Sequence, residues 1–214
     1  MNQQGKTGFR EKWKQAWAYR SFRNQTLSGA LSLIGLFSFL PFFFKLIESR
    51  NGIQLDDWLL DIIHPLDVSV AIFLFVWAVT FLMIVRMVQN PQIFVIMLWA
   101  YLILTLMRVF TISFIGLNAP KGLLILVDPL SNIFYGPRFI TKDLFYSGHT
   151  STAFLMFLCL RNKADKIFTL TATLTIATLL LIQHVHYTID IVAAPFFALL
   201  SYLISKKMIH DFSY

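Results

Sequence analysis

Long apolar runs separated by short polar segments make up most of this chain of 214 residues. A helix that crosses a bilayer needs roughly 20 mainly apolar residues. The runs that qualify, or nearly so, cover about residues 27–46, 67–87, 93–117, 145–160, 167–183 and 187–205. The last two form one stretch of 39 residues, too long for a single span, so we expect a fold back at Gln183, His184 and His186. The pattern predicts an all-α integral membrane bundle of six transmembrane helices.

The composition agrees with a protein whose apolar surface mostly faces lipid. Hydrophobic residues make up 57% of the chain and charged residues only 14%, whereas a soluble domain carries about 25% charged residues. We expect a basic N-terminal segment over 1–26, a six-span catalytic membrane domain over 27–205 and a short tail over 206–214. No cleavable signal peptide is apparent, because the first 23 residues are polar and basic. The single Cys159 excludes an intramolecular disulfide.

Basic residues predict the orientation of the bundle. With a cytoplasmic N-terminus, 12 of the 18 basic residues lie inside and five outside, while Arg108 falls within the third span. Those inside are Lys6, Arg10, Lys12, Lys14, Arg20, Arg23, Arg86, Arg161, Lys163, Lys166, Lys206 and Lys207. The positive-inside rule favours cytoplasmic N- and C-termini. The net charge of +7 is therefore a signal of topology and not of nucleic-acid binding, with contact to anionic lipid as a secondary role.

The same topology gathers three reactive side chains on the non-cytoplasmic face. His149 lies at the outer start of the fourth span, and His186 and Asp190 lie at the outer start of the sixth. Ionisable residues at such positions are costly to place, which makes a function the default hypothesis. We therefore expect a site on the non-cytoplasmic face of the membrane.

The spacing of His186 and Asp190 favours a paired imidazole and carboxylate. Residues four apart share one face of a helix. Asp190 would accept a hydrogen bond from one ring nitrogen of His186 and leave the other as a directed base or nucleophile. The alternative is structural: His186 caps the helix and Asp190 pairs with a lysine.

The segment Ser147-Gly148-His149-Thr150 is typical of a helix N-terminus that meets a phosphate. Ser147 is a favourable N-cap, and Gly148 lets a ligand approach the backbone. Free N–H groups at a helix start attract anions, and His149 would donate a proton to a leaving oxygen. Ordinary helix capping explains the tetrapeptide alone equally well, so the argument depends on its combination with the later motif.

Together these motifs resemble the sphingomyelin synthase family, a branch of the type-2 phosphatidic acid phosphatase superfamily. The resemblance is strong over 143–150, which reads Asp-Leu-Phe-Tyr-Ser-Gly-His-Thr, and over 186–190, which reads His-Tyr-Thr-Ile-Asp. It implies a catalytic triad of His149, His186 and Asp190. Weaker similarity covers Arg108 with Thr111 and Asn118-Ala119-Pro120, and a first-loop motif at Leu55-Asp56-Asp57 that lacks the family's prolines.

One departure separates the transferase branch from the lipid phosphatases. The phosphatases carry Ser-Arg shortly before their second histidine, and those positions are Leu179 and Leu180 here. Their K-x-x-x-x-x-x-R-P motif is also absent. The chain thus lacks the arginines that clamp a terminal phosphate in the phosphatases, which favours a phosphate diester as substrate. Arg108 needs a partner in its span, and the candidates are the substrate phosphate, Asp57, Asp61 and Asp190.

We therefore predict a phospholipid head-group transferase. In the predicted reaction, His186 attacks phosphorus, His149 protonates the departing alcohol, and His149 then deprotonates the hydroxyl of a ceramide-like acceptor. Substrate contacts are assigned to Arg108, Asp143, Ser147, Gly148, Thr150 and Tyr187. The partners are a phospholipid donor and a lipid alcohol; no cofactor or metal is expected, since His184 with His186 has no evident third ligand. The alternatives are a lipid phosphatase or phosphodiesterase that uses water, and a non-enzymatic lipid-binding protein with a vestigial triad.

Overall fold

The described part of the chain is a bundle of helices. The computed structural model describes residues 8–126 and 140–209, so 1–7 of the predicted N-terminal segment and 210–214 of the predicted tail lie outside the described residues. Within them the helices are α1 (Phe9–Ala18), α2 (Arg20–Ser49), α3 (Trp58–Ile62), α4 (Ser69–Gln89), α5 (Pro91–Phe114), α7 (Gly148–Cys159), α8 (Lys163–Ile182) and α9 (Thr188–Met208). The described residues form no sheet, and one isolated bridge joins Ile53 to Leu117.

Five of these helices, α2, α4, α5, α8 and α9, are long and apolar enough to cross a membrane. Their lipid-facing surfaces carry large exposed apolar side chains such as Phe42, Leu74 and Phe81, which water would disfavour and lipid accepts. These helices indicate a multi-pass membrane protein. The predicted six spans are not confirmed: the fourth predicted run forms α7, which has 12 residues and extends about 18 Å at 1.5 Å per residue.

Polar residues next to the apolar runs explain where the inner helices begin. The Asn90 side chain accepts hydrogen bonds from the backbone N–H groups of Gln92 and Ile93, and Pro91 occupies the first turn of α5. The Asn162 side chain caps α8 in the same way, accepting from the N–H of Ala164. Asparagine at the N-cap satisfies donors that have no partner within the helix, and proline is favoured directly after it.

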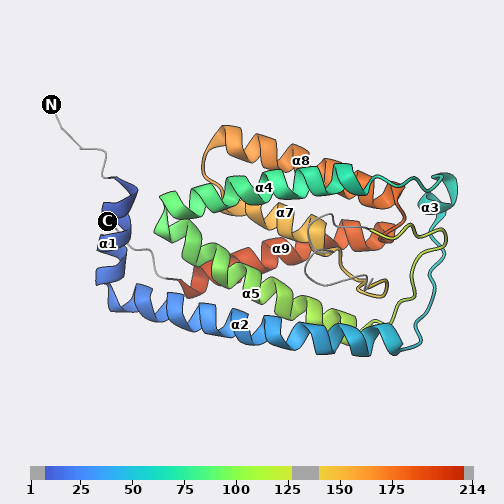
Figure 1. Ribbon diagram of the computed structural model, residues 1–214, viewed down its shortest axis with the longest axis horizontal. Helices are drawn as coiled ribbons and strands as arrows, with labels where there is room; N and C mark the ends of the chain where they lie inside the picture. Colours follow the sequence, from blue (N-terminus) through green and yellow to red (C-terminus); the bar gives the residue numbers. More distant parts are fainter. Residues whose placement is uncertain (1–7, 127–139, 210–214) are drawn as a thin grey trace.

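The short helix α7 lies inside the bundle, packed against α4, α5, α8 and α9 (Figure 1). Its buried side chains include Ala153, Leu155, Met156 and Cys159. Because α7 is covered by neighbouring helices, its polar N-terminal turn lies within the protein and not in lipid. This position places Gly148 and His149 at one end of the bundle interior.

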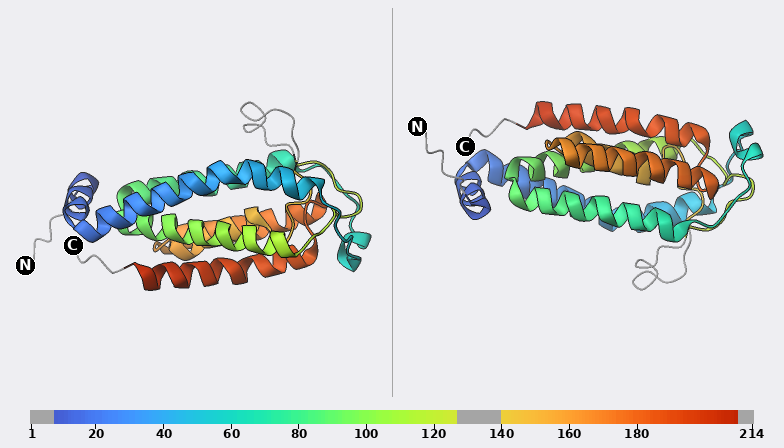
Figure 2. Two further views of the ribbon diagram at one scale, coloured as in Figure 1. Left: turned by 90° about the horizontal axis from the view of Figure 1, so that it is seen from below. Right: turned by 90° about the horizontal axis from the view of Figure 1, so that it is seen from above.

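The predicted fold back between the last two spans is confirmed, because α8 ends at Ile182 and α9 begins at Thr188. Gln183, which is fully buried, holds this turn against the start of α4. Its side-chain oxygen accepts from the N–H of Val68 at 3.1 Å, and its amide nitrogen donates to Oγ of Ser69 at 2.8 Å. The turn and α3 lie at the end of the bundle opposite to α1 (Figures 1 and 2).

Candidate active site

His186 and Asp190 form a buried pair at the start of α9. Nδ1 of His186 lies 3.3 Å from Oδ2 of Asp190, and both side chains are almost completely excluded from solvent. The same Oδ2 accepts a hydrogen bond from the backbone N–H of Tyr187 at 3.2 Å. An ionised carboxylate favours the tautomer with the proton on Nδ1, so Nε2 of His186 is left as the basic nitrogen.

A backbone hydrogen bond joins the two sequence motifs. The N–H of Ser147 donates to the carbonyl of Asp190 at 3.1 Å. Oγ of Ser147 accepts from the N–H of Thr150 at 3.4 Å and caps α7. The first turn of α7 is therefore held directly against the first turn of α9, although the two are about 40 residues apart in the sequence.

Arg108 of α5 takes Asp143 as its partner. Its Nη2 lies 2.8 Å from Oδ2 of Asp143, and its Nε donates to the carbonyl of Tyr146 at 3.0 Å. The sequence-based candidates among the acids, Asp57, Asp61 and Asp190, were therefore wrong as partners. The loop before α7 returns to α5 and brings Asp143 within reach, and this path is not encoded by local spacing.

Tyr146 anchors that loop in the bundle. The side chain is fully buried, its hydroxyl donates to the carbonyl of Leu104 at 2.8 Å, and its ring stacks on Phe197 with 4.1 Å between ring centroids. Thr111 adds a hydrogen bond from its hydroxyl to the carbonyl of Phe145 at 3.0 Å. These contacts hold the segment before Gly148 against α5 and α9.

Gly148 allows the Arg108 guanidinium to lie against the start of α7. A Cβ added to Gly148 would lie 2.7 Å from Cζ of Arg108 and closer still to Nη1. Any side chain at this position would displace the guanidinium. The role foreseen for Gly148 was close approach of a ligand to the backbone, and the group that approaches it here is the arginine.

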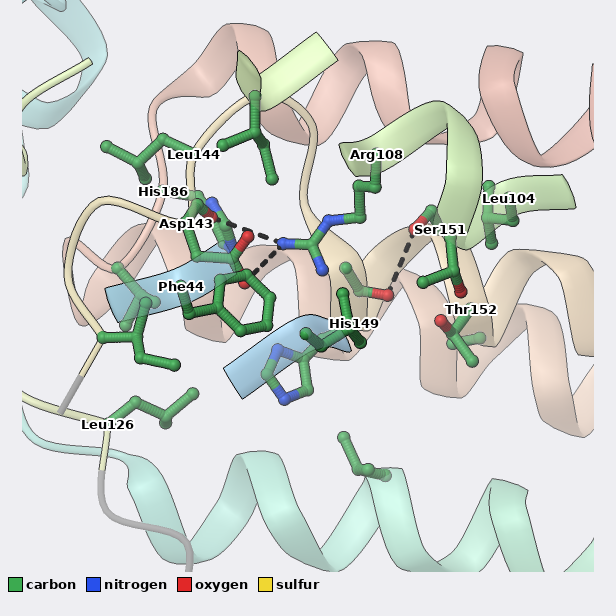
Figure 3. A pocket seen from close by; sticks show the side chains of 18 of the residues that line it. Phe44, Leu104, Arg108, Leu126, Asp143, Leu144, His149, Ser151, Thr152 and His186 are labelled. Atoms are coloured by element: carbon green, nitrogen blue, oxygen red, sulfur yellow. Dashed lines mark hydrogen bonds and ion pairs between the residues drawn. The ribbon is translucent and has the colours of Figure 1, made fainter. Parts of the chain in front are cut away.

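Five residues of the site line one cavity of about 530 Å³. Arg108, Asp143, Gly148, His149 and His186 all contribute to its walls. Figure 3 shows the guanidinium of Arg108 beside the Asp143 carboxylate, with the imidazoles of His149 and His186 in the same pocket. Such a cavity is of the size that binds small molecules or part of a lipid.

The His149 ring reaches across the cavity toward α4. It meets the Phe73 ring edge to face, with 6.0 Å between the ring centroids and 81° between the ring planes. Aromatic contact of this kind helps to fix the orientation of a ring. His149 therefore has a defined position at the cavity wall, on the helix that follows the Ser147 cap.

Three of the residues assigned to substrate binding lie outside the cavity lining. Ser147 and Thr150 are buried and bonded to each other through the α7 cap. The Tyr187 hydroxyl donates to the carbonyl of Asn118 at 2.9 Å and accepts from the N–H of Leu55 at 3.2 Å. Their observed contacts are structural, and substrate contact by them stays a prediction.

Asp57 supports the site in a way that sequence reasoning missed. Its carboxylate accepts from the N–H of Thr188 at 2.6 Å and from the Thr188 hydroxyl at 2.9 Å, directly after the His186–Tyr187 turn. Burial raises the pKa of Asp57, but hydrogen bonds from Thr188, Leu59 and Leu60 together outweigh it and hold the pKa below the usual value. The weak similarity of Leu55-Asp56-Asp57 to the family's first-loop motif is the feature of the sequence that could have pointed to this residue.

Glu48, at the end of α2, holds the segment that leads to Asp143. It accepts from the N–H and hydroxyl of Thr141 at 3.0 and 2.6 Å, and from the N–H of Lys142 at 3.1 Å. Nothing in the sequence around Glu48 indicated this contact, because the partners are more than 90 residues apart.

His184 is bonded on both sides to the backbone. Nδ1 lies 2.8 Å from the carbonyl of Lys121, and Nε2 lies 2.9 Å from the carbonyl of Ile63. Both nitrogens thus face the loops that cover this end of the bundle. In residues 8–126 and 140–209, no three His, Cys, Asp or Glu side chains gather as a ligand set for a metal ion.

The arrangement combines a buried histidine–carboxylate pair, a second histidine and an arginine around one cavity, within a membrane bundle. No curated protein and no solved structure matches the chain. Residues 142–207, which contain α7, α8 and nearly all of α9, match the family profile described as PAP2 superfamily C-terminal. This match shows that the C-terminal part of the chain is similar to the type-2 phosphatidic acid phosphatase superfamily.

Proposed function

We propose that the protein transfers a phospho-head-group from a glycerophospholipid to the hydroxyl of a ceramide-like lipid. The observation that carries the proposal is the shared cavity, which is lined by His149, His186 and Arg108. Asp190 does not line the cavity and pairs with His186 through Nδ1. A nucleophile with an orienting carboxylate, a second acid–base group and a cation for phosphate are the parts that phosphoryl transfer needs.

In the first step Nε2 of His186 attacks phosphorus while Asp190 holds the proton on Nδ1. The bond from phosphorus to the glyceride oxygen breaks, and protonated His149 gives its proton to that oxygen. Diacylglycerol leaves, and the head-group phosphate stays bound to His186. Burial of Asp190 makes the charge that develops on the imidazolium easier to stabilise, since water does not screen the pair.

In the second step His149, now neutral, removes the proton from the lipid alcohol. The alkoxide oxygen forms a bond to phosphorus, and the bond from phosphorus to Nε2 of His186 breaks. The enzyme returns to its initial protonation state with His149 charged. Each proton and electron pair is accounted for by the two histidines and the two alcohols, so the cycle requires no further reactant.

Arg108 and Asp143 suit a phosphate diester better than a monoester. A diester carries a single negative charge, and one guanidinium already paired at 2.8 Å with Asp143 provides little surplus positive charge. A monoester near neutral pH carries up to two charges and is usually clamped by more than one arginine. The leucines at 179 and 180 replace the polar pair of the phosphatases with apolar side chains.

The walls of the cavity fit lipid chains. Phe43 and Phe44 of α2 and Val76 and Val79 of α4 are among the residues that line it. Both helices are candidate spans, so an acyl chain between them would remain in an apolar environment while the phosphate reaches Arg108.

The second candidate is a lipid phosphatase or phosphodiesterase in which water replaces the lipid alcohol. The superfamily match supports both reactions equally. Purified protein supplied with labelled phospholipid, with and without ceramide, separates them: a labelled sphingolipid supports transfer, and a free phospho-head-group in both samples supports hydrolysis. His186→Ala is the matched control, and label that stays in the donor with the unmodified protein would refute both reactions.

We also propose that both termini are cytoplasmic and that the site faces the opposite compartment, with 27–205 as the catalytic domain. The excess of basic residues at the α1 end supports this orientation. Cysteines introduced at Asn51 and at Lys163 should react with an impermeant thiol reagent from opposite sides of sealed vesicles. Labelling of both from one side would refute the topology; native Cys159 is buried and serves as the background.

A further inference from the structure

The end of the bundle opposite to the site carries a strong positive charge. Among the described residues it holds eleven basic side chains and two acidic ones, Glu11 and Asp165, for a net charge of +9. The basic residues are Arg10, Lys12, Lys14, Arg20, Arg23, Arg86, Arg161, Lys163, Lys166, Lys206 and Lys207. Asp165 is already paired with Arg86 at 2.7 Å. Little negative charge is left at this end to balance the exposed cations.

Helix α1 lies across this end, transverse to the spans (Figures 1 and 2). It is docked by the Trp13 indole, whose Nε1 donates to the carbonyl of Val88 at 2.7 Å and whose ring packs edge to face on Phe22 and Phe94. Val88 is in the last turn of α4, and the 21 residues of α4 extend about 30 Å, the thickness of the hydrocarbon layer. Trp13 therefore fixes α1 at the level where α4 leaves the hydrocarbon.

One stripe of α1 combines cations and indoles. Arg10, Trp13, Lys14 and Trp17 follow the i, i+3, i+4, i+7 spacing of one helix face. Arg10 and Lys14 are exposed, Trp17 is 41% exposed, and Trp13, Lys14 and Trp17 border a shallow groove. Indoles favour the interfacial layer of a bilayer, and cations beside them meet phosphate groups there.

We propose that this stripe, Arg10-Trp13-Lys14-Trp17, binds the headgroups of anionic phospholipids. The occupant is a lipid phosphate with a net negative charge, held by Arg10 and Lys14, while Trp13 and Trp17 contact its glycerol region. A zwitterionic headgroup places its own cation next to these basic side chains and loses most of the attraction. This surface is separate from the cavity and does not depend on the proposed head-group transfer.

The test uses the full chain in detergent micelles supplemented with phosphatidylglycerol or phosphatidylcholine. Native mass spectrometry counts retained lipids, and thermal unfolding is followed in the same samples. We expect phosphatidylglycerol to be retained several-fold more than phosphatidylcholine and to raise Tm. Each basic residue near an anionic surface contributes about fivefold in affinity, so Arg10→Gln with Lys14→Gln should weaken binding at least tenfold. Salt at 0.5 M should weaken the wild-type preference.

The matched control is Lys45→Gln with Lys121→Gln, two exposed cations at the opposite end, which should leave the preference unchanged. Tm in phosphatidylcholine alone shows whether each variant is folded. If the α1 variant is unfolded, Trp17→Ala replaces it, and the expected result is again a reduced preference. Equal retention of the two lipids by the wild type, or an unchanged preference in a folded α1 variant, would overturn the proposal.

Discussion

Replacing Gly148 by alanine should disable the site through Arg108. Ordinary contact with a Cβ begins near 3.4 Å, and the added atom would lie 2.7 Å from Cζ of Arg108, so the guanidinium must retreat by at least about 0.7 Å. That movement disturbs its contacts with Asp143 at 2.8 Å and with the Tyr146 carbonyl at 3.0 Å.

The magnitude follows from the size of this displacement. Hydrogen bonds to charged groups contribute about 1.5–3 kcal/mol each, and partial loss of two should destabilise the fold by roughly 2 kcal/mol. A misplacement of about 1 Å in a catalytic site lowers turnover roughly 100-fold. We therefore expect Gly148→Ala to remain folded with a Tm lowered by a few degrees, while kcat/KM for the phospholipid donor falls about 100-fold.

Initial rates of donor consumption and thermal unfolding measure the two effects. Gly35→Ala is the matched control, since a Cβ there has no neighbouring atom within 4 Å, and alanine is favoured over glycine in a helix. A double-mutant cycle with Arg108→Ala tests whether the loss of activity arises from the displaced guanidinium. If it does, the double variant is no less active than Arg108→Ala alone. Additive losses, or wild-type activity in Gly148→Ala, would refute the reasoning.

Three further predictions concern the roles of individual groups. With a nitrophenyl phosphodiester, whose leaving group needs little general acid help, His149→Ala should retain first-step activity that His186→Ala lacks, measured as nitrophenolate release; equal loss would refute this assignment of roles. Because hydrogen bonds hold the pKa of Asp57 below its unfolded value, its stabilisation is present above about pH 4 and is lost as pH falls through the lowered pKa. The Tm difference between wild type and Asp57→Asn should therefore shrink in acid, and a constant difference would contradict this. Tyr146→Phe removes the hydrogen bond from the Tyr146 hydroxyl to the Leu104 carbonyl and should cost about 0.5–1.5 kcal/mol in chemical denaturation; an unchanged midpoint would exclude the bond as a stabilising contact.

Features set by neighbouring residues were accessible from the pattern of residues alone. The positions of the five candidate spans follow from run length and apolarity, because lipid selects helices that satisfy their own backbone. The fold back at Gln183 follows from the same length argument. The pairing of His186 with Asp190 was expected from their four-residue spacing on a helix; the pair forms, but His186 lies in the turn before Thr188, the first residue of α9.

Contacts between distant segments depended on how the helices pack. Arg108 had several acidic candidates, and it pairs with Asp143 because the loop before α7 returns to α5 and is anchored there by Tyr146. Asp57 and Thr188 are 131 residues apart, so no local spacing links them. Whether a short apolar run spans the bilayer also depends on its neighbours: α7 is too short to cross alone, and its polar first turn is accommodated because surrounding helices shield it from lipid.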